Sequence, residues 1–211
     1  VMNIFARAFT GNKPGLNLQK KAIHLRTGES IPGEIKQIVE NRIVFDSDVT
    51  SATKLPSDQI RAVRLTAVLT EPDLNEVQQD RLLTVPRINK IYPPTLLLIA
   101  RNGDLLRCRL VGMTEDAVTV ETRLETIEIE RSLLSQIIWL DKLSEKADPA
   151  PETESPEVTV RAKLSNGNQL SMVPQKVTEE AIIGSHPYLG KTEVNLDDTD
   201  VLIFGSFVSL A

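Results

Sequence analysis

Residues 96–140 read LLLIARNGDLLRCRLVGMTEDAVTVETRLETIEIERSLLSQIIWL, and this stretch decides the fold class. Asn102-Gly103 separates two apolar runs and predicts a two-residue hairpin turn of type I′, because these residue types tolerate positive φ best. A second polar turn follows at 114–116. The last run, 136–140, is apolar throughout, which is typical of a strand that is covered on both sides or closes a barrel. The stretch therefore predicts an antiparallel meander of short strands.

Apolar and polar residues alternate after the first turn, with the period of a strand that buries one face. Leu106, Cys108 and Leu110 share one face and are expected to be buried. Arg107 and Arg109 share the other face and are expected to point to solvent. Since an unpaired cysteine is among the most buried residue types, the pattern favours a core residue over a nucleophile at Cys108.

The same pattern occurs twice more in the chain. Gly28 and Gly103 lie 75 residues apart, and Gly28 and Gly167 lie 139 apart. The first offset aligns Ile31, Ile35, Ile43 and Phe45 with Leu106, Leu110, Val118 and Val120. The second aligns Ile31, Ile43 and Leu55 with Leu170, Ile182 and Val194, although Pro174 and Gly184 stand in place of Ile35 and Phe45. The sequence thus predicts an all-β chain of three repeated five-stranded antiparallel meanders.

These meanders set the expected division of the chain. We expect a lead-in segment at 1–20, the first meander at 21–66, a connector at 67–95, the second meander at 96–142, a disordered linker at 143–157 and the third meander at 158–211. A proline early in a first turn with acidic neighbours predicts one short helix at 72–83, between the first and second meanders. Three prolines and scarce apolar residues predict that the linker separates an independently folding third meander.

Composition limits the chemistry that the chain can perform. The 211 residues carry a formal net charge of −5, with one cysteine and two histidines. Because ligand sets and nucleophilic triads need several such residues, we expect no catalytic residue, no metal site and no cofactor. The acidic runs at 46–48 and 197–200 lack the glycine and distal glutamate of a calcium loop, and turn chemistry explains them better. With no apolar run of about 18 residues, no membrane span is expected.

Basic residues form the only candidate binding set in the sequence. Solvated side chains are the favoured interpretation, and a patch for an anionic partner is the alternative. The residues of this set are Arg7, Lys13, Lys20, Lys21, Arg26, Arg101, Arg107 and Arg109.

Five short strands per copy, tightly turned and partly preceded by a helix, resemble the small barrels of the Sm-like fold. This resemblance implies that each meander closes as a small barrel; the alternative is that the meanders pair into shared sheets. It also implies nucleic-acid binding as an alternative function. However, the turns at 39–41, 114–116 and 178–180 lack the Asp and Asn pair with which that family binds nucleotides. The negative net charge also makes nucleic acid the second choice.

Residues 80–113, DRLLTVPRINKIYPPTLLLIARNGDLLRCRLVGM, followed by 120–140, are similar to a repeat region of large extracytoplasmic proteins of planctomycete-type bacteria. Some of those proteins also carry a thioredoxin-like domain. The resemblance implies a periplasmic or otherwise extracytoplasmic location, with the cytoplasm as the alternative. We therefore expect a non-catalytic interaction or scaffolding region in a longer polypeptide. Its partner would be another protein or another domain of the same chain.

Overall fold

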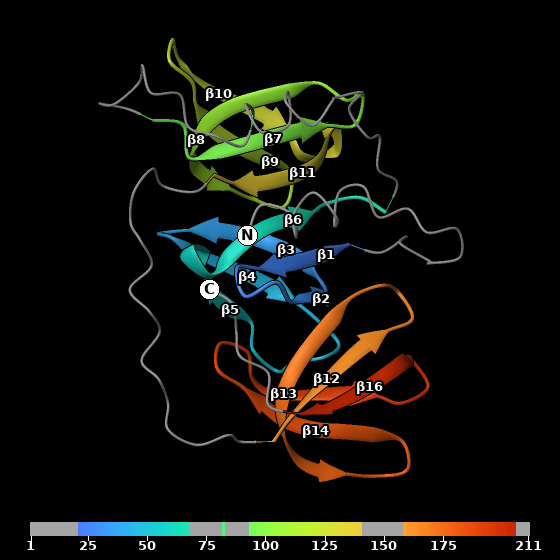
Figure 1. Ribbon diagram of the computed structural model, residues 1–211. Helices are drawn as coiled ribbons and strands as arrows, with labels where there is room; N and C mark the ends of the chain where they lie inside the picture. The colour runs from blue at the N-terminus through green and yellow to red at the C-terminus, as the bar shows by residue number, and fades with distance from the viewer. Residues whose placement is uncertain (1–20, 68–81, 83–92, 141–157, 206–211) are drawn as a thin grey trace.

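The computed structural model describes residues 21–67, Leu82, 93–140 and 158–205. We name 21–67 the first segment, 93–140 the second segment and 158–205 the third segment (Figure 1). The strands of the first segment are β1 (Ala22–Leu25), β2 (Ser30–Pro32), β3 (Glu34–Val39), β4 (Arg42–Asp46), β5 (Lys54–Pro56) and β6 (Ile60–Arg64). Those of the second are β7 (Leu96–Ala100), β8 (Leu105–Met113), β9 (Ala117–Glu121), β10 (Thr126–Glu130) and β11 (Leu134–Trp139). Those of the third are β12 (Thr159–Leu164), β13 (Gln169–Val177), β14 (Ala181–His186), β15 (Gly190–Asn195) and β16 (Thr199–Gly205).

The three segments pair their strands in the same order. In each segment the first strand pairs antiparallel with the second and with the fifth, as β7 does with β8 and β11. The second strand, which is divided into β2 and β3 in the first segment, pairs with the third, and the third pairs with the fourth. The prediction of an all-β chain is confirmed for the described residues.

The first hairpin of each segment turns on a glycine with positive φ. The φ angles are +86° at Gly28, +90° at Gly103 and +81° at Gly167, and each glycine N–H donates to the residue three positions earlier. Asn102 does not have positive φ, so the predicted type I′ turn is wrong. Ala100 N–H donates to Asp104 O, so the turn has three residues. Gly103 is the residue of this turn that adopts the left-handed conformation.

A β-bulge bends the second strand of each segment. The pairing register with the third strand shifts at Lys36, Val111 and Gln175, which follow the turn glycine at the same spacing in sequence. A bulge adds an unpaired residue and bends the strand. In the second and third segments one long strand can therefore pair with the first strand through one half and with the third strand through the other.

All sixteen strands are connected in one sheet, whose main path runs from β15 to β5 without closing. The sequence left two arrangements open, meanders that close as separate small barrels and meanders that pair into shared sheets, and the pairing corrects the first of them. No fourth strand pairs with a fifth among the described residues. Instead, β6 of the first segment pairs antiparallel with β11 of the second, with Val63 opposite Ile137. The sheet is continued at this position rather than closed.

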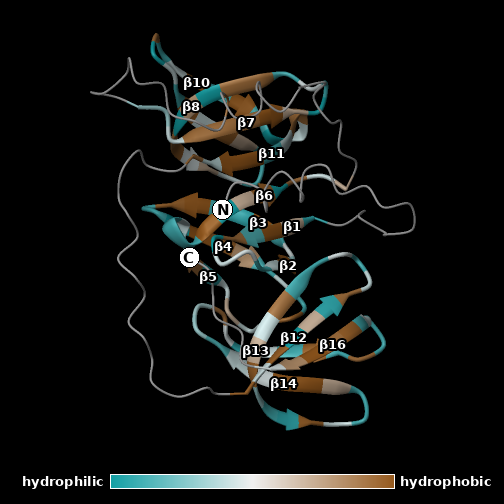
Figure 2. Ribbon diagram, viewed as in Figure 1, coloured by the Kyte–Doolittle hydropathy of each residue, from teal (hydrophilic) through white to brown (hydrophobic). Residues whose placement is uncertain are grey.

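The core is built from isoleucine, leucine and valine, and Figure 2 shows these apolar residues along the strands. One hydrophobic cluster contains buried residues from all three segments. The predicted buried face of β8 is confirmed at Cys108, and Leu106 and Leu110 on the same face are partly buried and pack against this cluster. The run 136–140 is covered on both sides as predicted, because Ile137 belongs to the large cluster and Ile138 to a second one.

Several predictions fall on residues outside the described ranges. They concern the lead-in segment 1–20, most of the connector 67–95 with its helix at 72–83, and the linker 143–157. Of the connector helix, only Leu82 is described; it is helical and packs against the second cluster, which consists of Ala62, Leu97, Ile99, Ile138 and Leu140. The division into domains stays a prediction.

Candidate functional site

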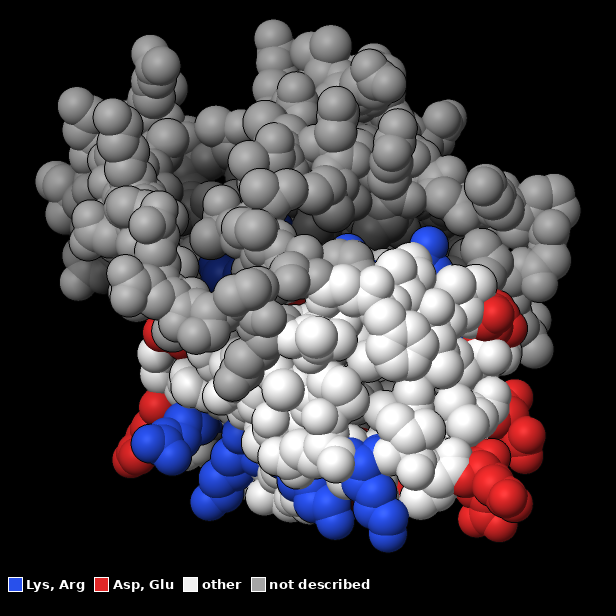
Figure 3. Space-filling model, turned by 60° about the horizontal axis from the view of Figure 1, so that its bottom comes forward, with Lys and Arg blue, Asp and Glu red and all other residues white. Residues whose placement is uncertain are grey.

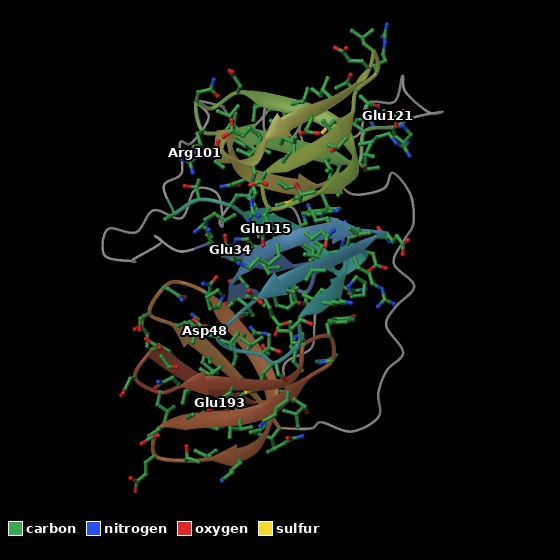
Figure 4. All side chains as sticks on the ribbon, turned by 180° about the vertical axis from the view of Figure 1, so that it is seen from behind. Glu34, Asp48, Arg101, Glu115, Glu121 and Glu193 are labelled. Carbon is green, nitrogen blue, oxygen red and sulfur yellow. The ribbon has the colours of Figure 1, made fainter. Side chains whose placement is uncertain are left out.

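The predicted basic set does not form one patch in the described part of the chain. Lys21 pairs with Glu34 in the first segment, and Arg109 pairs with Glu121 at 3.6 Å in the second. Glu121 lies on the opposite side of the second segment from Arg101 (Figure 4). Arg26 and Arg101 are exposed, whereas Arg7, Lys13 and Lys20 lie outside the described residues. Lys21 and Arg109 of this set are thus balanced by carboxylates.

Arg107 corrects one prediction about the solvent-facing side of β8. Its Nε donates to the Leu82 carbonyl at 3.0 Å, and burial lowers the pKa of its guanidinium. The side chain is therefore half-buried and bound to Leu82 instead of pointing freely to water. The sequence carries no signal for this contact, because Leu82 is 25 positions away.

Burial shifts the pKa values of Cys108 and His24 away from the range that suits chemistry near neutral pH. Cys108 is 2% exposed, and burial raises the pKa of its thiol to about 12, so its reactive thiolate is scarce near neutral pH. Burial, with the nearby charge of Arg64, lowers the pKa of His24 to about 4. No group of three or more metal-ligating side chains occurs among the described residues.

A carboxylate and a histidine join the first segment to the third. Glu29 Oε2 lies 2.9 Å from His186 Nε2, and these side chains are only 9% and 3% exposed. His186 Nδ1 accepts backbone N–H groups from Tyr188 at 3.1 Å and Leu189 at 3.2 Å. Because Nδ1 is an acceptor, the ring proton lies on Nε2 and is donated to Glu29. Buried polar groups need hydrogen-bond partners, and here Glu29 of the first segment and His186 of the third are partners of each other.

Other hydrogen bonds complete this contact. Glu29 Oε1 accepts the Ser171 N–H at 2.8 Å, and Oε2 accepts the Thr27 hydroxyl at 2.8 Å. Burial alone would raise the pKa of Glu29, but the hydrogen bonds from His186, Thr27 and Ser171 outweigh it and hold the pKa below its ordinary value. The carboxylate is therefore ionised at neutral pH. We call Glu29, His186 and Ser171 the polar clasp.

Backbone contacts extend the same junction. Ser30 pairs with Gln169, and Gln169 Nε2 donates to Gly28 O at 3.0 Å. A second backbone contact joins β15 to the loop after β4, where Glu193 N–H donates to Val49 O at 2.9 Å. Figure 4 labels Glu193 and Asp48, the neighbour of Val49. The third segment is thus docked on the first, a contact that the sequence did not predict. Independent folding of the third segment stays a prediction.

An arginine links the first segment to the second. Arg131 Nη2 lies 3.7 Å from Glu34 Oε1, and Nη1 donates to Glu115 O at 3.5 Å. Glu34 and Glu115 lie side by side at this junction in Figure 4. Burial lowers the pKa of Arg131, and the two glutamates oppose that effect. The arrangement neutralises charge at a contact between segments, a structural role.

Four strands pair with only one other strand within the described part of the sheet: β5, β10, β15 and β16. Edge strands can recruit foreign strands, and proteins usually block them with charges or proline. Three of these edges are blocked in this way, by Lys54 and Pro56 on β5, Glu128 and Glu130 on β10, and Lys191 and Glu193 on β15. β15 is also contacted by the first segment through Thr50 and Thr192.

β16 differs from the other three edges. Its sequence is TDVLIFG, with Asp200 as its only charged residue. Val201, Ile203 and Phe204 are 45%, 38% and 60% exposed. Figure 3 shows an uncharged area flanked by charged side chains on the face that it turns forward. The open edge of β16 is therefore the best candidate for a binding site on the described surface.

Known proteins give no further guide to this site. No family model matches the chain, and neither the curated proteins nor the solved structures contain a match. No described helix is long and apolar enough to cross a bilayer.

Proposed function

We propose that this chain is a non-catalytic interaction and scaffolding region that binds other protein through the open edge of β16. The observation that carries the proposal is the exposure of three large apolar side chains on an unblocked edge strand, Val201, Ile203 and Phe204. Strand addition supplies main-chain hydrogen bonds for affinity and side-chain contacts for specificity. The buried Cys108 and the structural role of His186 support a role without chemistry of its own.

We also infer that the three segments are copies of one ancestral unit. Their common pairing order, the positive φ of their turn glycines and the equal placement of their bulges support this inference. Repeated units that cannot bury all their apolar surface alone gain stability by packing on their neighbours. Such an array suits a scaffold in a larger and, by the resemblance noted above, extracytoplasmic protein. Cell fractionation of the full-length protein tests the compartment.

Nucleic acid is the less favoured partner. Lys21 and Arg109 are paired with glutamates, and Arg107 is partly covered. Binding through phosphates would require cations that release counterions, with affinity falling steeply as salt rises. Tight, salt-sensitive binding of a single-stranded oligonucleotide would overturn the ranking of the two functions.

The proposal is tested with a strand that the chain itself already uses. The ligand is a peptide of residues 134–140, LSQIIWL, with lysines added at both ends. The protein carries Trp139→Phe, so that the fluorescence of tryptophan comes from the peptide alone. Binding is followed by this fluorescence as dilute protein is titrated with the peptide. We expect saturable binding that Ile203→Lys abolishes. Thr126→Lys, on the exposed edge of β10, is the matched control and leaves binding unchanged. No saturable binding, or equal binding by the Ile203→Lys protein, would reject the proposal.

A further inference from the structure

The fifth strands of the three segments occupy equivalent positions but differ in their neighbours. β6 pairs with β1 and with β11, and β11 pairs with β7 and with β6. β16 pairs with β12 and with no second strand in the described part of the chain. The pairing with the first strand shows which residues of the three fifth strands are equivalent. Ile23, Leu98 and Ala162 stand at the same distance before the turn glycine of their segments. Their partners on the fifth strands are Val63, Ile137 and Leu202, which are therefore equivalent.

Two of the three large apolar residues that β16 exposes correspond to buried residues in both other fifth strands. Phe204 corresponds to Leu65 and Trp139, which are 6% and 9% exposed, whereas Phe204 is 60% exposed. Ile203 corresponds to Arg64 and Ile138, which are 9% and 0% exposed. The third, Val201, corresponds to the buried Ala62 and the half-buried Gln136. Like the run that ends β11, the sequence VLIF at 201–204 is apolar throughout, a pattern typical of a strand that is covered on both sides. β16 therefore has the sequence of a covered strand, but no second strand covers its edge in the described part of the chain.

The β6–β11 pairing has a local two-fold symmetry. Its central pair is Val63 opposite Ile137, which occupy the same position in their own segments. The Leu65 N–H donates to Ser135 O at 2.9 Å, so the backbone polar groups of alternate residues in β6 face β11. In β16 the same alternation directs the backbone groups of Leu202 and Phe204 toward the open edge. A strand that pairs there in the β6–β11 register would place its own equivalent residue opposite Leu202.

We propose that the strand on this edge is β16 of a second copy of the chain, paired antiparallel about a two-fold axis at Leu202. Val201 of one copy then lies opposite Ile203 of the other, and both apolar residues are covered. Asp200 lies opposite Phe204 and not opposite the Asp200 of the second copy, so no like charges meet directly. An isologous contact of this kind closes as a dimer and leaves neither β16 with an open edge. The inference rests on the proposed function and names the partner of the same edge.

The register is tested by cross-linking single-cysteine variants. Val201→Cys and Ile203→Cys proteins are prepared separately, mixed and oxidised. Directly opposite residues that do not exchange hydrogen bonds have Cα atoms about 4.5 Å apart, within the roughly 4.4–6.8 Å range of disulfides. We expect a disulfide-linked dimer of the two variants. Cys108 does not compete, because it is buried and burial raises the pKa of its thiol to about 12. Val201→Cys mixed with Thr126→Cys is the control and is not expected to cross-link.

Sedimentation equilibrium of the whole chain tests the dimer itself. We expect the average mass to rise with concentration from one copy toward two. Ile203→Lys should hold the mass at one copy over the same range, and Thr126→Lys should behave like the parent protein. Because Ile203 is 38% exposed, its replacement should leave the circular dichroism spectrum unchanged, and also the Tm at concentrations where the parent protein is monomeric.

The outcomes separate this inference from the proposed function. A protein that stays monomeric at every concentration, or that dimerises equally well with Ile203→Lys, overturns the second copy as the partner. If that monomer still binds the 134–140 peptide through β16, the interaction function stands without the dimer. If neither the peptide nor a second copy binds, both proposals are rejected.

Discussion

The two junctions of the first segment are built from different chemistry. Toward the second segment, β6 pairs with β11, and Ile137 and Ile138 are fully buried. Toward the third segment, a single residue pair joins β2 to β13, and Glu29 makes buried contacts with His186 and Ser171. One hydrophobic cluster is common to both junctions, and the polar contacts are added to it at this one. One junction therefore continues a sheet, and the other adds a polar clasp to the shared apolar packing.

We expect the stability of the two junctions to differ in how strongly it depends on pH. An apolar junction gains from area removed from water, which varies little with pH. A buried carboxylate is stabilising only while it is ionised and fully hydrogen-bonded, and it is costly when a partner is lost. We therefore expect the first and second segments to behave as one unit under conditions that loosen the third.

The largest effect is expected from truncating the apolar junction. Ile137→Ala removes a side chain that is 0% exposed at the centre of the β6–β11 pairing. It should lower the free energy of unfolding by about 2–5 kcal/mol. Urea denaturation measures the loss. Val111→Ala, at a site that is 61% exposed, is the control and should change it by less than about 0.5 kcal/mol. Similar losses for both would contradict the assignment of this junction.

Removing the charge of the polar clasp should have a smaller and more local effect. Glu29→Gln directs an amide N–H₂ toward groups that are themselves donors, which should weaken the clasp by about 1–3 kcal/mol. With a protease site inserted at 149–151, the cut halves of the parent protein should stay together in gel filtration, and those of the variant should separate. Glu193→Gln, at an exposed carboxylate, is the control. Halves of the variant that remain associated would show that the clasp is dispensable.

Acid should reproduce the Glu29→Gln effect. The pKa of Glu29 is lowered in the folded chain, so its contribution is present above the ordinary glutamate value of about 4.3 and is lost as the pH falls through the lower folded value. The difference in stability between parent and Glu29→Gln proteins should therefore be largest at neutral pH and shrink in acid. Urea denaturation at a series of pH values measures it. A difference that is constant with pH would contradict an ionised Glu29.

The smallest effect is expected at the margin of the polar clasp. Gln169→Ala removes an exposed hydrogen bond from Nε2 to Gly28 O. The loss should be about 0.5 kcal/mol, because water replaces the lost partner. Association of the cut halves, measured by isothermal titration, resolves such a change. A loss of association free energy as large as that of Glu29→Gln would mean that the junction depends on exposed hydrogen bonds such as that of Gln169 and not on the buried carboxylate.

Local sequence patterns predicted local structure well. The alternation of Leu106, Cys108 and Leu110 predicted the buried face of β8, and the apolar run 136–140 predicted a strand covered on both sides. Each of these features depends on neighbours in sequence, because side chains alternate between the faces of a strand. The all-β class followed from them.

Contacts between segments could not be predicted in the same way. Glu29 and His186 are 157 residues apart, and neither lies in a pattern that requires the other. The pairing of β6 with β11 replaced the expected barrel closure, since the edge of a fifth strand can be covered equally well by another segment. The β16 edge was visible in the sequence only as an apolar run, 201–204. That this run lacks a second paired strand became clear from comparison with β11, which is paired on both edges within the described part of the chain.

Hydrogen exchange of the β16 amides tests the central claim most directly. The amides of Leu202 and Phe204 face the open edge, whereas that of Leu65 is bonded to Ser135. Exchange is followed by NMR in dilute and in concentrated protein. We predict that Leu65 exchanges slowly at both concentrations, and that Leu202 and Phe204 exchange fast when dilute and slowly when concentrated. Exchange of Leu202 and Phe204 that does not change with concentration would contradict an edge that binds a second strand.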